Sequence, residues 1–155
     1  MTAPDPQTRI ATLRSAEGRV DPAELDQVWA ELDPLRPEEL LGTWRGSAFD
    51  TGHPAHVLLT SLRWYGKRFH SLDRVDPIVC HGEDGELVAN KEAAKGGASL
   101  WPVEFRGEVT ATMVYDGQPI LDHFKRIDAD TLMGIMNGKG VLHEGAHYYF
   151  VLERE

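Results

Sequence analysis

Between residues 103 and 115, apolar and polar side chains alternate along the chain. The apolar set is Val103, Phe105, Gly107, Val109, Ala111, Met113 and Tyr115. A period of two is typical of a strand that buries one face and exposes the other. The dipeptide Asp116-Gly117 follows as a strong signal for a tight hairpin. With a returning strand over 118–127, a turn at 128–130 and a strand over 131–137, this region is predicted to form an antiparallel meander.

The rest of the chain after residue 42 is also predicted to be mostly extended. Strands are expected over 43–49, 64–70, 75–80, 86–89 and 147–153, with a short helix over 54–62 and a polar loop over 91–99. Few of these strands are separated by helices, so parallel βαβ units are not expected. About eight strands in this arrangement are typical of an antiparallel β-barrel or a strongly curved sheet.

The first 41 residues have a helical pattern instead. Asp21 is suited to cap a helix, Pro22 fits its first position, and Glu24 completes a capping box. An apolar stripe follows at helical spacing, formed by Leu25, Val28, Trp29 and Leu32. We therefore expect residues 1–41 to be a helical extension packed on a barrel domain of residues 42–155, the two forming one folding unit.

The Asp116-Gly117 turn fixes a register for the hairpin. It places Glu108 opposite Lys125 on the exposed face, as an ion pair across the strands. The same register turns Asp122 and Arg126 toward the interior. Inward charges are costly unless they are paired or hydrogen-bonded. Two interpretations stay open: a structural Asp122–Arg126 ion pair, or a polar anchor for a ligand in an internal cavity.

Several interior positions carry small residues. On the strand over 131–137, Gly134 is expected opposite Phe124, with Leu132 and Met136 also inward. Glycines at 107 and 134 and the alanine at 111 leave room for a ligand, or mark corners where a barrel bends. The opposite face carries an apolar patch that N-terminal helices or a second subunit of a homodimer should cover. This patch consists of Leu121, Ile127, Met133 and Ile135.

Three motifs carry a family resemblance. They are Gly42-Thr43-Trp44-Arg45-Gly46, Trp64-Tyr65-Gly66-Lys67-Arg68-Phe69, and the run from Met113 to Phe124. With them the chain resembles the bacterial GXWXG-domain proteins, in which the GXWXG segment is followed by a second domain of unknown function. A Gly-x-Trp on the first strand after a short helix is also similar to the calycin barrels, namely lipocalins, fatty-acid-binding proteins and nitrobindins. This second similarity implies a barrel fold alone.

Composition narrows the function classes. Asp and Glu number 25 against 16 Lys and Arg, a net charge of −9 that argues against nucleic-acid binding. Cys80 is the single cysteine, so neither a disulfide within the chain nor a multi-cysteine metal site can form. The sequence shows no secretion signal and no membrane-spanning run, which predicts a cytoplasmic protein with at most peripheral membrane contact.

The candidate site residues are mainly on the predicted barrel strands. Trp44 is expected to plug one end, with direct ligand contact as the alternative. Lys67 and Arg68, among aromatic residues, either protect a strand edge or contact an anionic headgroup or carboxylate. His147 is either a surface residue or an axial haem ligand.

Together these features predict non-enzymatic binding of a hydrophobic or amphipathic small molecule, such as a lipid or phospholipid, inside the barrel. No metal and no cofactor is expected. Two alternatives are a haem-binding barrel of the nitrobindin type and a small-barrel enzyme using Asp122 and a histidine as acid and base. The expected ligand contacts are Arg126, Asp122, Phe124, Trp44, Tyr115, Met136, Lys67 and Arg68.

Overall fold

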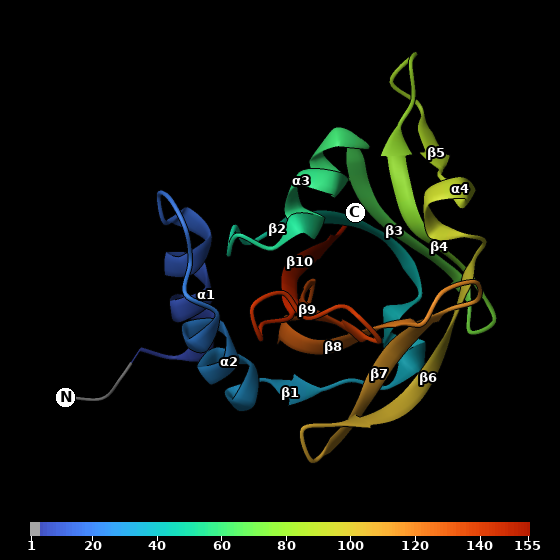
Figure 1. Cartoon of the computed structure of the whole chain (residues 1–155). Coiled ribbons are helices and arrows are strands. Elements are labelled where there is room, and N and C mark those ends of the chain that lie inside the picture. The colour runs from blue at the N-terminus through green and yellow to red at the C-terminus, as the bar shows by residue number, and fades with distance from the viewer. Residues whose placement is uncertain (1–3) are drawn as a thin grey trace.

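A computed structural model describes residues 4–155 and consists mainly of antiparallel strands (Figure 1). Eight strands pair in sequence order, and the last pairs with the first, so that the sheet closes into a ring. These strands are β2 (Gly42–Ala48), β3 (Trp64–Ser71), β4 (Arg74–His81), β6 (Ala98–Phe105), β7 (Glu108–Tyr115), β8 (Ile120–Asp128), β9 (Thr131–Gly138) and β10 (Tyr148–Arg154). The predicted mainly β, barrel-like fold is confirmed.

Shorter elements lie around this ring. The two-residue strand β1 (Asp33–Pro34) pairs with β8, and β5 (Leu87–Ala89) pairs with β4. The helices are α1 (Pro6–Ser15), α2 (Pro22–Glu31), the 3₁₀ turn η1 (Pro37–Leu40), α3 (Pro54–Ser61) and α4 (Lys91–Ala94). The last of these was predicted to be part of a loop.

Helices α1 and α2 cover one outer side of the ring (Figure 1). Asp21 caps α2 by accepting a hydrogen bond from the Ala23 amide, as its sequence predicted. The helices bury Ile10, Leu25 and Trp29 in a cluster with three residues of the predicted outer patch, Ile127, Met133 and Ile135. Leu121, the fourth, is half-buried and lies outside that cluster. The prediction that helices of the same chain cover this face is confirmed for the other three.

The predicted continuous strand over 103–115 is wrong. Arg106 (φ 54°) and Gly107 (φ 80°) both have left-handed backbone and form a two-residue turn between β6 and β7. Phe105 and Glu108 are paired across this turn and lie on the same face, so odd-numbered residues face outward before the turn and inward after it. Phe105 consequently packs against Trp29 outside the ring. Val109, the second residue of β7, is 59% exposed.

The register between β7 and β8 differs from the prediction by two residues. Met113 is paired with Asp122, because residues 116–119 form a longer turn than the predicted dipeptide. A shift of two residues leaves every side chain on its predicted face. The predicted Glu108–Lys125 ion pair is therefore still formed, although Lys125 is buried and not exposed as predicted. Gly134 lies opposite Phe124, as predicted.

The interior is filled and closed at the end where η1 lies. Trp44 is fully buried, and its indole N–H donates to the Leu40 carbonyl at 2.7 Å. This confirms its predicted role as a plug. The small residue at 134 does not leave a void, because a Cβ there would lie 2.4 Å from the Phe150 ring.

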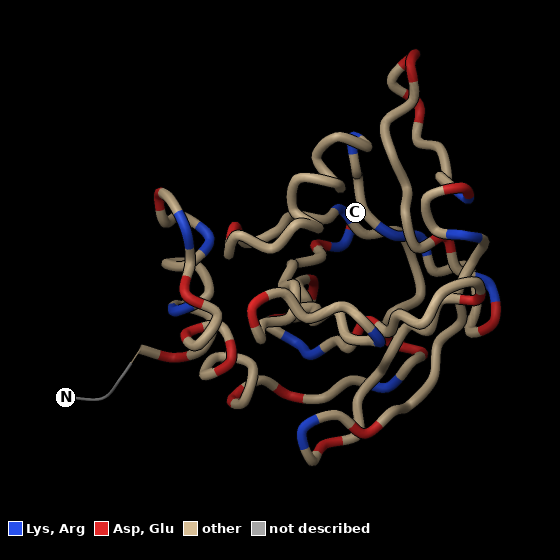
Figure 2. The backbone as a smooth tube through the Cα atoms, in the orientation of Figure 1, with Lys and Arg blue, Asp and Glu red and all other residues tan. Residues whose placement is uncertain are grey.

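Charged residues of both signs are distributed over the helices and hairpins (Figure 2). In the part of the chain that the structure describes, the helices are all too short or too polar to cross a membrane.

Candidate ligand-binding cavity

A mainly apolar cavity of about 160 Å³ lies inside the ring at the end away from η1. Helix α3 contributes Leu58 and Leu59 to its lining, and the strands contribute Trp64, Ile78 and Phe150. Its lining is mainly apolar and includes a few polar side chains, the combination that is typical of small-molecule sites.

A buried ion pair forms part of the cavity lining. Lys67 on β3 and Asp122 on β8 are 3% and 2% exposed, and the Lys67 Nζ lies 2.9 Å from the Asp122 Oδ2. The ammonium also donates to the Pro77 carbonyl at 3.0 Å. Three aromatic rings surround it, with Nζ 5.3 Å from the centroid of Phe150 and 5.8 Å from that of Tyr115. The third is Trp64, at 5.9 Å.

An irregularity in β3 brings both Trp64 and Lys67 to the cavity. The pairing of β3 with β4 shifts at Gly66, so that residues of opposite parity on either side of it face the interior. Only a glycine fits at this position, because a Cβ would lie 1.9 Å from the Trp44 carbonyl oxygen. The Trp64-Tyr65-Gly66-Lys67 motif thus positions the Lys67 ammonium in the cavity wall.

Burial changes the ionisation of the polar groups in the cavity wall. Desolvation raises the pKa of Asp122 above its usual range, although the neighbouring Lys67 charge opposes this. Burial raises the pKa of Tyr115 and of Tyr148, and the Asp122 charge raises both further. Both phenols are therefore neutral at physiological pH and able to donate hydrogen bonds.

Two polar atoms in this wall lack partners. The Asp122 Oδ1 and the Tyr148 hydroxyl are buried and make no hydrogen bond with any of residues 4–155. Buried polar atoms of folded proteins nearly always have a partner. Because Asp122 and Tyr148 both line the cavity, they form a polar part of its wall with unused hydrogen-bonding capacity.

Four of the eight predicted ligand contacts line the cavity: Asp122, Lys67, Tyr115 and Met136. Trp44 and Phe124 belong to the packed core and are outside the lining. Arg68 follows Lys67 on the same strand and lies half-buried on the other face. The lining also includes Tyr148 and Gln118, which the sequence interpretation missed.

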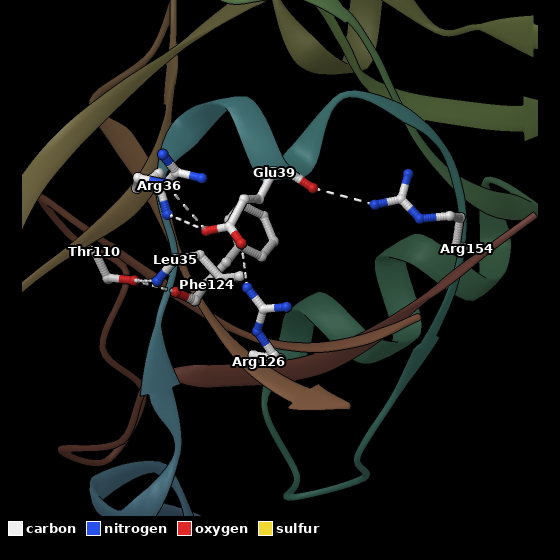
Figure 3. Close-up of polar contacts among 7 residues, drawn as sticks. All are labelled: Leu35, Arg36, Glu39, Thr110, Phe124, Arg126 and Arg154. Atoms are coloured by element: carbon white, nitrogen blue, oxygen red, sulfur yellow. Dashed lines mark hydrogen bonds and ion pairs between the residues drawn. The ribbon is translucent and has the colours of Figure 1, made fainter. Parts of the chain in front are cut away.

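Arg126 lies at the opposite end of the ring, so the Asp122–Arg126 ion pair, one of the two interpretations of the sequence, is not formed. Residues four apart on one strand are separated by about 13 Å, beyond the reach of a direct ion pair for these side chains. Arg126 instead pairs with the Glu39 carboxylate on η1 (Figure 3). Glu39 also accepts a hydrogen bond from the Arg36 amide at 2.8 Å, which lowers the pKa of its carboxyl.

Figure 3 shows that Arg126 is part of a network closing the η1 end. The guanidinium of Arg154 donates to the Glu39 carbonyl at 3.2 Å. Nearby, the Leu35 amide donates to the Thr110 hydroxyl at 3.0 Å, and that hydroxyl donates to the Phe124 carbonyl. These contacts hold η1 against β7, β8 and β10, so Arg126 has a structural role.

Within residues 4–155, the cavity lining contains no histidine. His147 is half-buried on the outer side, where its Nδ1 lies 2.9 Å from the Met136 carbonyl oxygen. His123, next to Asp122, points to the same outer side, where its ring stacks on the Phe105 ring with the two centroids 4.0 Å apart. The residues present therefore do not fit a haem with His147 as axial ligand, nor an acid–base pair of Asp122 with a histidine.

Comparison with known proteins connects these features to a family. Residues 27–85 match the profile of the GXWXG proteins, and residues 96–154 match that of a domain of unknown function, DUF4334. A solved structure described as a protein from Thermomonospora curvata is 38% identical to the chain. The match covers 98% of this chain and 99% of that one, with a TM-score of 0.88. The chain belongs to the GXWXG family.

The two family segments of this GXWXG protein together build the cavity. Lys67 lies in the GXWXG segment and Asp122 in the DUF4334 segment, and the closed ring includes strands from both. The motif residue Trp44 holds the opposite end through its bond to Leu40. Comparison with curated proteins gives no match.

Proposed function

We propose that this GXWXG protein binds a compact, mainly apolar small molecule in the cavity beneath α3. The observation that carries the proposal is an apolar cavity of about 160 Å³ whose wall includes the buried Lys67–Asp122 pair. Pockets for small molecules typically combine an apolar lining with a few convergent polar groups. The cavity has this composition.

The size of the cavity favours a compact ligand over a full-length acyl chain or a phospholipid. An engineered apolar cavity of about 150 Å³ in another protein stays dry and binds benzene. A molecule with one ring or a short branched chain is therefore the class that the cavity can hold without rearrangement. This revises the lipid ligand expected from the sequence toward a smaller molecule.

Helix α3 is the element best suited to admit the ligand. It has eight residues, and none of them is fully buried. Val57 on its outer side is 71% exposed, while Leu59 contacts the inner core and lines the cavity. Segments with few buried contacts open at a lower free-energy cost than the core strands.

The test is thermal unfolding with toluene as the probe, in the wild type and in two variants with the same substitution. Ala93→Leu adds volume at the cavity wall, and Ala129→Leu adds it on the exposed β8–β9 turn. A ligand that binds the folded state raises Tm. We expect toluene to raise the Tm of the wild type and of Ala129→Leu, and to raise that of Ala93→Leu less. Equal shifts in all three proteins, or no shift in any, would contradict the proposal.

A further inference from the structure

Two residues that line the cavity each carry a buried polar atom whose hydrogen-bonding capacity is unused. Asp122 accepts a hydrogen bond from Lys67 through Oδ2, while its Oδ1 has no partner among the described residues. The Tyr148 hydroxyl has none there either. Both residues line the cavity, and their side chains lie within a few per cent of full burial.

The charges of the cavity are already balanced. Lys67, for which contact with an anionic group was one of two interpretations of the sequence, is held by Asp122, by the Pro77 carbonyl and by three aromatic rings. A ligand carboxylate near this pair would face the Asp122 carboxylate at close range in a desolvated site. Like charges that share a buried site repel each other strongly.

From these contacts, and resting on the proposed function, we propose that the ligand carries an uncharged hydrogen-bond donor, such as a hydroxyl, which binds the Asp122 Oδ1. The Tyr148 hydroxyl is available to the same group, since a phenol can donate to the ligand oxygen. The site thus selects neutral alcohols or amides on an apolar skeleton and excludes carboxylates.

Three small aromatic probes test this selectivity by calorimetric titration of the full-length protein. Benzyl alcohol has a hydroxyl donor, anisole is its isomer without a donor, and benzoate has a carboxylate. A hydrogen bond to a charged acceptor corresponds to an affinity ratio of about 10- to 150-fold. We expect benzyl alcohol to bind about that much more tightly than anisole, and benzoate to bind most weakly.

Two variants locate the preference within the cavity. The double replacement Lys67→Met with Asp122→Leu removes the acceptor together with its counter-charge, and should bring the ratio of benzyl alcohol to anisole affinity close to one. Arg126→Ala is the matched control, because Arg126 lies outside the cavity lining and pairs with Glu39. That variant should keep the wild-type ratio. The probe series in the wild type decides the matter even where the double variant is unstable.

The outcomes separate this inference from the proposed function. Equal affinities of benzyl alcohol and anisole would overturn the inference while leaving the apolar cavity as a binding site. Tightest binding by benzoate would overturn it as well and would make Lys67 an anchor for anions. If no probe binds, and toluene also fails to raise Tm, the proposed function fails together with the inference.

Discussion

Replacing Lys67 by Met tests the energetics of the buried pair. Both side chains are almost completely buried, and the Asp122 carboxylate has no hydrogen-bond partner other than Lys67 among residues 4–155. Removing one member of such a pair leaves an uncompensated charge and typically costs about 3–5 kcal/mol. The free energy of unfolding at pH 7.5, from urea denaturation followed by tryptophan fluorescence, should fall by about that amount.

The same variant should have a characteristic pH dependence. Desolvation already raises the pKa of Asp122 in the wild type, and without Lys67 nothing opposes this effect. A carboxyl whose folded-state pKa lies above its unfolded value of about 3.9 binds a proton more tightly when folded. The stability deficit of Lys67→Met should therefore shrink as the pH is lowered from 7.5 to 5.

Lys125→Met provides the matched control for this pH effect. Lys125 is also buried, but its partner Glu108 has a side chain that is 42% exposed and can be hydrated after the change. The loss of stability in Lys125→Met should therefore not decrease in the same way between pH 7.5 and 5. Adding Asp122→Leu to Lys67→Met should restore much of the lost stability, because an apolar pair can replace a buried ion pair. A deficit of Lys67→Met that is below about 1 kcal/mol, or equal at both pH values, would refute the reasoning.

Three further predictions concern residues outside the cavity. Burial lowers the pKa of His123 to about 4. As the pH falls below 6.5, this imidazole is protonated more readily in the unfolded chain than in the folded protein. The free energy of unfolding of the wild type should therefore decrease between pH 6.5 and 4, by at most about 3 kcal/mol. Urea denaturation of His123→Gln should show a smaller acid-dependent loss than the wild type, whereas replacing the exposed His81 by Gln should not change that loss. Gly134→Ala places a methyl group against the Phe150 ring and should cost about 1–3 kcal/mol; an unchanged Tm would contradict the close packing. Arg126→Ala breaks a partly exposed pair with Glu39 and should cost less than about 1 kcal/mol in urea denaturation, so a loss as large as that of Lys67→Met would contradict its position in the fold.

Local patterns in the sequence were sufficient to predict most of the strands and the faces on which the residues of β8 and β9 lie. The alternation on β8 placed Asp122 and Phe124 inside and Lys125 on the exposed outer face, and an error of two residues in register left these faces unchanged. Lys125 does lie on the outer side, but it is buried there against α2, which the alternation alone does not show.

The turn at Arg106-Gly107 was missed because apolar residues keep the same spacing through it. Phe105 before the turn packs under the helices on the outer side, and Ala111 after it packs in the inner core, so both positions are apolar.

The partner of Asp122 could not be read from local patterns. Lys67 lies 55 positions earlier, on a strand that reaches Asp122 only across the closed ring. The sequence interpretation offered Arg126 as the possible ion-pair partner of Asp122, because Arg126 is the nearest inward cation along the chain. In the structure Arg126 lies at the other end of the ring and pairs with Glu39. Tyr148 was missed because residues 148–152 are all apolar or aromatic, so that no alternation shows which face of β10 is inside.

The most direct test of the account is a crystal structure of the protein with benzyl alcohol bound. The account predicts the phenyl ring in the apolar cavity beneath α3, with the hydroxyl oxygen about 2.5–3.0 Å from the Asp122 Oδ1. An empty cavity at saturating benzyl alcohol would contradict the account. So would a bound phenyl ring whose hydroxyl points away from Asp122 while a water molecule donates a hydrogen bond to the Oδ1.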